Sequence, residues 1–263
     1  MLQNTIRKTN HLIKATFILC ALSCSATYAG TLTGMVANWH LDEESGQRAN
    51  DLSGYNLQGQ LGATSGTDSS DPVWTLRRFD NAALKFDGDD YVKVLPNAKL
   101  QPSKLSVEAW VKMDQTTDPT ILPYIVAKGG STLNNGCAFA SYALYSHDNN
   151  AYFYVSNGSS YVESPTISSI DLTDGQWHYL VGTYDRQNVK LYIDGVDAGG
   201  TPATFAINYS TAAFPYRHLY IGDFDGDSNH CNDYNGSFSG TIDEVRIWNK
   251  ALTPSEVSLR YSN

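Results

Sequence analysis

Short runs in which apolar and polar residues alternate occupy much of the chain after residue 35. The clearest run lies between residues 177 and 195, where apolar residues stand at every second position from Val189 to Ile193. A period of two is typical of a β-strand with one buried face. Polar residues at 185–188 and the pair Asp194-Gly195 predict tight turns on either side of this strand. The region therefore predicts antiparallel hairpins.

Similar patterns recur along the chain and predict further strands. The expected strands cover 35–41, 84–94 with a turn in the middle, 105–113, 124–128, 141–146, 151–156, 177–184, 189–193, 219–222 and 240–249. One helix is expected, because Thr253-Pro254-Ser255-Glu256 combines an N-cap, a proline at the first helical position and the glutamate of a capping box. The pattern predicts an all-β protein with one short C-terminal helical turn.

The first 29 residues have a different character. Arg7, Lys8 and Lys14 precede the short apolar run 15–22, and Thr27-Tyr28-Ala29 fits a signal-peptidase site. We expect a secretory signal peptide at 1–29, a single domain at 30–263, and export to the extracellular space or the periplasm. A lipidated Cys24 is an alternative, although the residues before it fit that signal poorly. No other segment approaches the roughly 20 apolar residues of a membrane span.

Charge and cysteine content narrow the classes of function. The formal net charge is −9, which argues against binding to nucleic acid or to anionic membranes. Once the leader is removed, Cys137 and Cys231 remain. In an oxidising compartment we predict a disulfide between them, which would stabilise the folded state by roughly 4 kcal/mol in the chain-entropy model. Two free thiols are the alternative.

Four segments, in the same order along the chain, resemble laminin-G-like jelly-roll domains of the concanavalin A-like lectin/glucanase superfamily. They are Ala83–Gly88 with Tyr91-Val92, Leu105–Val111, Trp177–Gly195 and Phe238–Trp248. The resemblance implies a jelly roll, an antiparallel sandwich of two β-sheets. It also implies packing roles for Trp39, Trp110, Trp177 and Trp248 and a structural role for His178. The fold alone does not specify function, since it hosts lectins, glycosidases, lyases and adhesion modules.

The same resemblance implies a structural calcium ion held by Asp42, Asp87, Gly88 and Asp243. In a jelly roll the first and last strands are usually neighbours, which would bring Asp42 close to Asp243. Calcium takes six to eight oxygen ligands from carboxylates and turn carbonyls. In the alternative interpretation, Asp42 and Asp87 cap turns and Asp243 pairs with Arg246.

No motif for catalysis stands out. The loop 223–233 has Asp-x-Asp-x-Asp spacing, but Ser228 and Tyr234 replace the glycine and glutamate of an EF-hand. The Glu-x-Asp-x-Glu string of glucanases on this fold is absent, whereas a glycosidase needs two carboxyl groups at a fixed separation. A polysaccharide lyase would need a Tyr/His pair and a neutralising Arg or Gln; Tyr145 with His147, or Arg217 with His218, are candidates, although any tyrosine-rich chain offers such pairs.

Aromatic residues in polar loops and strands favour sugar binding, which combines ring stacking with hydrogen bonds to hydroxyls. The expected ligand-binding residues are Trp74, Tyr145, His147, Tyr161, Asp225, His230 and Tyr234. The sequence therefore predicts a secreted, lectin-like domain with structural calcium and a glycan or glycoconjugate as its partner. The alternatives are a polysaccharide-degrading enzyme and a protein–protein adhesion module.

Overall fold

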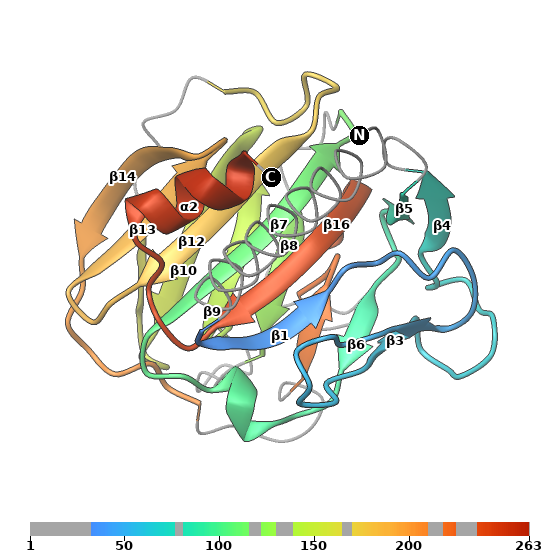
Figure 1. The fold of residues 1–263 in the computed structure, drawn as a ribbon, viewed down its shortest axis with the longest axis horizontal. Coiled ribbons are helices and arrows are strands. Elements are labelled where there is room, and N and C mark those ends of the chain that lie inside the picture. Colours follow the sequence, from blue (N-terminus) through green and yellow to red (C-terminus); the bar gives the residue numbers. More distant parts are fainter. Residues whose placement is uncertain are drawn as a thin grey trace, which may run out of the picture. The chain divides into compact units, whose positions relative to one another are not determined.

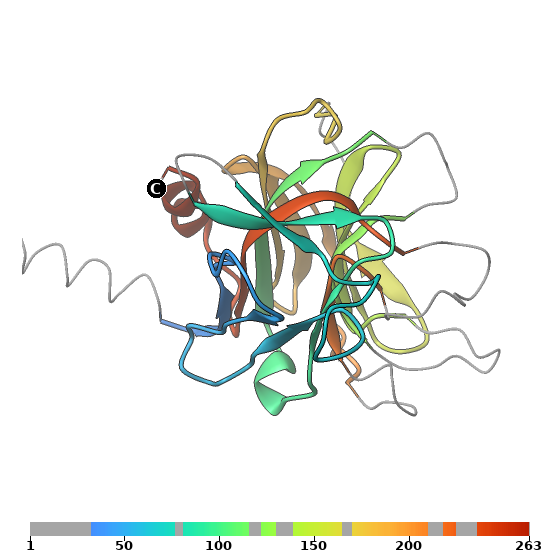
Figure 2. The same ribbon diagram turned by 90° about the vertical axis from the view of Figure 1, so that its right-hand side faces the viewer.

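Two antiparallel β-sheets form the body of the protein that begins at Met35. The computed structural model describes residues 33–76, 81–115, 122–129, 139–164, 170–209, 218–224 and 236–262. Figures 1 and 2 show the two sheets as two layers, seen from the front and from the side. The predicted antiparallel sandwich is confirmed.

Strand β16 (Ser239–Trp248) organises the first sheet, which we call sheet A. The sheet runs β14 (Val196–Pro202), β13 (Asn188–Ile193), β12 (His178–Tyr184), β7 (Leu105–Met113), β16, β5 (Ala82–Asp87) and β4 (Val73–Leu76). On one side β16 pairs with β7; on the other it pairs first with β5 and then with β1 (Met35–Trp39). Its register shifts between Asp243 and Arg246, and Glu244 there has a φ of 54°. The first and last strands are therefore neighbours, as expected.

The second sheet, sheet B, lies behind sheet A in Figure 1. Its order is β11 (Tyr161–Glu163), β10 (Asn150–Ser156), β9 (Tyr142–His147), β8 (Tyr124–Lys128), β15 (Leu219–Ile221), β6 (Val92–Val94), β3 (Gly59–Leu61) and β2 (Arg48–Ala49). Strands β8 to β11 lie side by side in chain order, whereas β15, from late in the sequence, joins β8 to the early strand β6.

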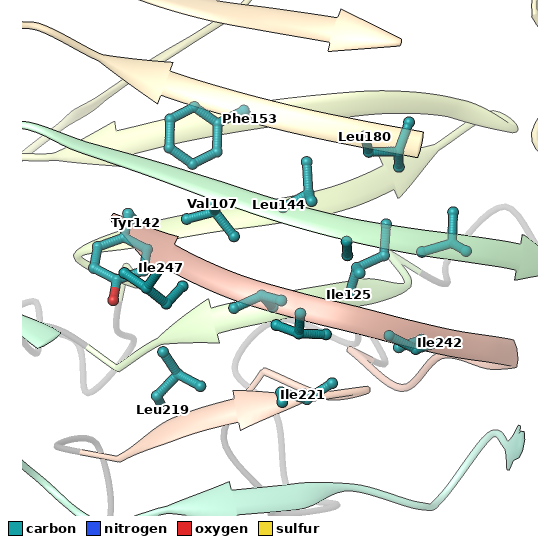
Figure 3. Close-up of a cluster of buried hydrophobic side chains, with 14 of the residues drawn as sticks. Val107, Ile125, Tyr142, Leu144, Phe153, Leu180, Leu219, Ile221, Ile242 and Ile247 are labelled. Atoms are coloured by element: carbon teal, nitrogen blue, oxygen red, sulfur yellow. The ribbon is translucent and has the colours of Figure 1, made fainter. Parts of the chain in front are cut away.

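Alternate apolar residues of both sheets meet between the layers. Figure 3 shows Val107 and Leu180 of sheet A with Leu144 and Phe153 of sheet B, all fully buried. The predicted inward face of 189–193 also joins this core. A Cβ atom on Gly182 would lie 2.1 Å from the Phe153 ring, so glycine allows the two sheets to approach closely here.

Helix α2 (Pro254–Tyr261) covers part of the outer face of sheet A (Figure 1). Its capping box is complete: the Thr253 hydroxyl accepts a hydrogen bond from Glu256 N–H, and the Glu256 carboxylate accepts one from Thr253 N–H. Val257 and Leu252 pack with Trp248 on this outer face. The predicted helix is confirmed. The short 3₁₀ helix η1 (Ala98–Leu100) was not expected.

Two packing expectations also hold. Trp39 and Trp248 are fully buried, and the Trp39 indole donates to Leu57 O at 2.7 Å. His178 lies between two turns, with Nδ1 2.8 Å from Asp194 and Nε2 3.2 Å from Asp174. Hydrogen bonding to Asp194 raises the His178 pKa despite the opposing effect of burial. The histidine thus joins the ends of the hairpin, which is a structural role.

No helix among the described residues is both long enough and apolar enough to cross a membrane.

Candidate functional site

A row of tyrosines crosses the outer face of sheet B. Tyr124 on β8 lies opposite Tyr145 on β9, and Tyr145 lies opposite Tyr152 on β10. The ring centroids are 5.2 Å apart for the first pair and 5.5 Å for the second. These rings face outward because their neighbours along the strands, including Leu144 and Phe153, fill the core.

Strand β11 extends this row at the edge of the sheet. Tyr161 and Glu163 are two residues apart and share a face, while Val162 between them packs on the core. Glu163 lies opposite Tyr154, whose ring is 5.2 Å from the Tyr161 ring. We call this set the tyrosine surface: Tyr124, Tyr145, Tyr152, Tyr154, Tyr161 and Glu163.

The tyrosine surface is partly open to solvent and carries one carboxylate. Tyr161 is 46% exposed and Tyr145 7% exposed, with Tyr152 half-buried between these extremes. The Tyr145 hydroxyl donates a hydrogen bond to the Glu163 carboxylate. Burial and then the nearby Glu163 charge raise the pKa of Tyr145, Tyr152 and Tyr161. The rings therefore stay neutral at physiological pH and keep their hydroxyl donors.

This arrangement suits a ligand with both apolar faces and polar groups. The exposed ring of Tyr161 and the half-buried ring of Tyr152 offer surfaces for stacking, and the hydroxyls and Glu163 offer hydrogen-bonding groups beside them. His147, at the end of β9, has its ring centroid 6.2 Å from that of Tyr152 and extends the surface in this direction.

The structure brings together only some of the expected ligand-binding residues. Tyr145, His147 and Tyr161 share the outer face of sheet B. Trp74 lies on β4 at the edge of sheet A, packs against the core, and donates from its indole to Gly46 O at 2.9 Å. Asp225, His230 and Tyr234 lie outside the described residues.

Glu163 was not among the expected residues. The available signal was its spacing of two from Tyr161, which places both side chains on one face if the segment is a strand. That strand is only three residues long, so its alternation was too short to recognise.

The structure does not bring the predicted calcium ligands together in one group. Asp42 groups with His40 and Glu244, with one ligand atom from each lying within 4.8 Å of the others. His40 Nδ1 is 3.4 Å from the Glu244 carboxylate. Asp243 belongs to neither of the two groups found among the described residues; it is buried and accepts a hydrogen bond from Glu244 N–H.

Asp87 belongs to the second group, with Asp89 and Asp90. Gly88 lies in the same turn with a φ of 109°, a conformation that favours glycine. Burial raises the Asp90 pKa to about 7, and the Asp87 and Asp89 charges add to this despite a hydrogen bond from Asp87 N–H. A cation at this turn would relieve the repulsion between these carboxylates.

The outer face of sheet A carries a buried ionic group beneath α2. Glu108 is fully buried and accepts a hydrogen bond from the Tyr179 hydroxyl at 2.7 Å. Arg246 lies 3.1 Å and Arg260 3.6 Å from its carboxylate. The Arg260 guanidinium also lies 4.2 Å from the centroid of a Trp248 ring. Burial opposes the charged form of Arg246, but the Glu108 and Glu244 carboxylates outweigh burial and raise the Arg246 pKa.

Cys137 and Cys231, the expected disulfide pair, lie outside the described residues, so the pairing stays a prediction.

Comparison with solved structures gives matches to binding domains. Domain 4 of AbnA, a GH43 extracellular arabinanase from Geobacillus stearothermophilus solved with arabinotriose, matches with a TM-score of 0.62 and 21% identity over 87% of this chain and 98% of that one. The binding domain of Paraclostridial Mosquitocidal Protein 1 matches with a TM-score of 0.63 and 15% identity over 88% of this chain. Botulinum neurotoxin type C, described as entering cells through two ganglioside molecules, matches with a TM-score of 0.61 and 15% identity over 89% of this chain.

These similarities are ones of fold, because all three identities are low. The match covers 52% of each of the two toxin chains, so the protein spans about half their length. A search of curated proteins found no significant match. The family model described as the concanavalin A-like lectin/glucanases superfamily matches residues 86–258, most of the sandwich. With its two antiparallel sheets, the chain belongs to the concanavalin A-like lectin/glucanase superfamily.

Proposed function

We propose that the protein binds carbohydrate through the tyrosine surface of sheet B. The observation that carries the proposal is the row Tyr124–Tyr145–Tyr152, extended by Tyr161 and Glu163 at the sheet edge. Neighbouring strands are about 4.8 Å apart, so a row over three strands spans about 10 Å, more than one sugar ring. Stacking on the rings would supply affinity, and the hydroxyls and the carboxylate would supply orientation.

Two structural relatives support a carbohydrate ligand. The arabinanase domain was solved with arabinotriose, and the neurotoxin is described as interacting with gangliosides.

The test is a glycan array followed by calorimetry on the oligosaccharides that bind. We expect wild-type protein to bind, and Tyr152→Ala/Tyr161→Ala protein to lose most of that binding while keeping its melting temperature within a few degrees. Unchanged binding by the double variant would reject the tyrosine surface. Binding to no glycan would favour an adhesion module. Release of new reducing ends or unsaturated products from the same glycans would favour an enzyme.

Export belongs to the same proposal, and it rests on the leader at 1–29 and on the cysteine pair. We expect the exported protein to begin at Gly30 by mass spectrometry and to contain no titratable thiols. Cys231→Ser should lower stability by roughly 4 kcal/mol. Two titratable thiols in native, exported protein would exclude the Cys137–Cys231 bridge.

A structural calcium ion is also proposed, at the turn that holds Asp87, Gly88, Asp89 and Asp90. This turn offers several oxygen ligands, whereas the group around Asp42 includes His40, and imidazole is a ligand that suits zinc or copper better than calcium. Calorimetric titration of metal-free protein should show calcium binding that Asp87→Asn weakens. The absence of any binding heat would reject the proposal.

A further inference from the structure

The outer faces of both sheets carry the same pair of groups, a tyrosine hydroxyl that donates a hydrogen bond to a glutamate. On sheet A the two strands are adjacent, and on sheet B one strand lies between them. On sheet A the pair is Tyr179 and Glu108, and on sheet B it is Tyr145 and Glu163. Each tyrosine also packs against further rings, Tyr179 against Trp110 and Tyr145 against Tyr124 and Tyr152. The two sites differ in whether a positively charged side chain pairs with the glutamate.

On sheet A the protein supplies the cation itself. Arg246 comes from β16 and Arg260 from α2, and both guanidinium groups lie within 4 Å of Glu108. Arg260 also lies over the Trp248 ring, so the cation contacts a carboxylate and an aromatic face at once. On sheet A, therefore, two arginines of the same chain balance the charge of the carboxylate that the tyrosine contacts.

On sheet B no such cation is present among the residues that the structure describes. Glu163 accepts the Tyr145 hydrogen bond, and no lysine, arginine or histidine of the described segments forms an ion pair with it. The rings of Tyr145, Tyr152 and Tyr161 are close enough for its charge to raise their pKa values. One carboxylate with half-exposed aromatic rings on the same face is a suitable environment for an ammonium group.

We propose that the tyrosine surface selects glycans that carry free amino groups, with the sugar ammonium placed between Glu163 and the neighbouring tyrosine rings. This inference rests on the proposed carbohydrate-binding function and names its ligand class. An oligomer of β-1,4-linked glucosamine has the required chemistry: it has C–H faces for the exposed ring of Tyr161 and the half-buried ring of Tyr152, and one ammonium on each residue. The formal net charge of the chain, −9, attracts cationic ligands and repels anionic ones, so it disfavours uronate and sulfated glycans.

The test compares two ligands that differ only in the amine. Calorimetry is carried out with the glucosamine hexamer and with its N-acetylated form, at a pH where the sugar amine is protonated. We expect the free-amine hexamer to bind about tenfold more tightly at low salt. Because part of this preference is electrostatic, it should shrink as sodium chloride is raised.

Two variants assign the preference to Glu163. Glu163→Gln removes the charge but keeps an acceptor for the Tyr145 hydroxyl, so the ratio of the two affinities should fall to about one. Glu44→Gln, in the exposed loop after β1, removes the same charge elsewhere and should leave the ratio unchanged. If Glu163→Gln fails to fold, Tyr145→Phe serves instead, because it removes the hydroxyl that holds the carboxylate and should reduce the ratio.

The possible results separate the two proposals. Equal affinity for both hexamers, or a preference for the acetylated one, overturns the amine inference and leaves carbohydrate binding intact. Binding to neither hexamer, with other glycans bound, also overturns it. Binding to no glycan at all overturns both proposals. Tighter binding to an oligo-lysine peptide than to the glucosamine hexamer overturns it in favour of a peptide ligand.

Discussion

The outer faces of the two sheets both carry aromatic rings with a glutamate, but they differ in how far these residues are covered. On sheet A, α2 lies over the outer face (Figure 1). The aromatic rings there pack with the helix, and the Glu108 carboxylate pairs with Arg246 and Arg260. On sheet B no helix of the described residues covers the rings, and Glu163 keeps contact with solvent. A buried carboxylate requires cations from its own chain, whereas a half-exposed one is solvated by water until a ligand arrives. The comparison shows that covering a face, more than its residue types, decides whether its rings and carboxylate are packed or left open to solvent.

The largest expected effect is a difference in stability between variants of the two glutamates, Glu108 and Glu163. Glu108→Gln would remove the fully buried carboxylate that pairs with the half-buried Arg246 and Arg260, at a cost of about 3–5 kcal/mol, or about 10 °C in melting temperature. Glu163→Gln should change stability by less than about 0.5 kcal/mol, because its surroundings are partly exposed. Thermal denaturation of both variants measures the difference. Equal losses would break the comparison.

A second pair of variants separates the aromatic rings by binding. Tyr152→Ala should weaken glycan affinity by about 2 kcal/mol, or about thirtyfold, with little change in melting temperature. Tyr261→Ala removes a ring that stacks on Trp110 beneath α2 and should lower the melting temperature while leaving affinity unchanged. Calorimetry and thermal denaturation of each variant check this. A loss of affinity in Tyr261→Ala would place the ligand on sheet A.

The turn that holds Asp87, Asp89 and Asp90 is a third acidic site, beside those of Glu108 and Glu163. Its pH dependence tests whether its carboxylates need a bound cation. The Asp90 pKa is raised to about 7, so the folded state holds this proton more tightly than the unfolded chain does. Stability should therefore fall as pH rises from about 4 to about 7, by about 1–2 kcal/mol after allowance for solvent screening.

Asp90→Asn removes this titration and is its control. Melting temperatures of wild-type and Asp90→Asn protein, measured in chelator over that pH range, should converge at low pH and separate at neutral pH, with the wild type lower. Calcium should raise the wild-type value at neutral pH. Parallel curves for the two proteins would show that Asp90 does not titrate in this way.

The smallest expected effect concerns the connection that leads to α2. The buried Ser106 hydroxyl donates to Lys250 O at 2.9 Å and accepts from Leu252 N–H at 2.8 Å. Ser106→Ala should cost about 1 kcal/mol by removing both bonds. Hydrogen exchange should increase in the helix and stay unchanged in β9 and β10. An increase in sheet B as well would show that α2 stabilises the whole sandwich.

Long alternating segments allowed much of the fold to be predicted. Strands β7, β12, β13 and β16 each place apolar residues at alternate positions over six or more residues, and the capping box located α2. Strands β2, β3 and β11 have only two or three residues, too few for a period to be visible. Trp74 lies in β4, which follows a polar loop and carries no clear alternation.

The site was harder to predict because it depends on register. Tyr145 and Tyr161 were recognised as aromatic candidates, but only cross-strand pairing places them with Tyr124 and Glu163. The calcium expectation correctly placed the first strand beside the last. It did not foresee the bulge in β16, where Glu244, next to Asp243, joins the group that contains Asp42.

The position of β16 has a consequence for how the chain acquires its structure. Strands β1 and β5 emerge early in synthesis, yet both pair with a strand near the C-terminus, and the hydrogen bond between Asn38 and Arg246 joins residues 208 apart. Such long loops make closure slow and leave apolar strand edges unpaired until β16 has been synthesised. A ribosome that stops before residue 239 would release a chain whose first strand has no partner. The synthesis of Ser239–Trp248 thus decides whether the product can form the sandwich or is recognised by chaperones and proteases.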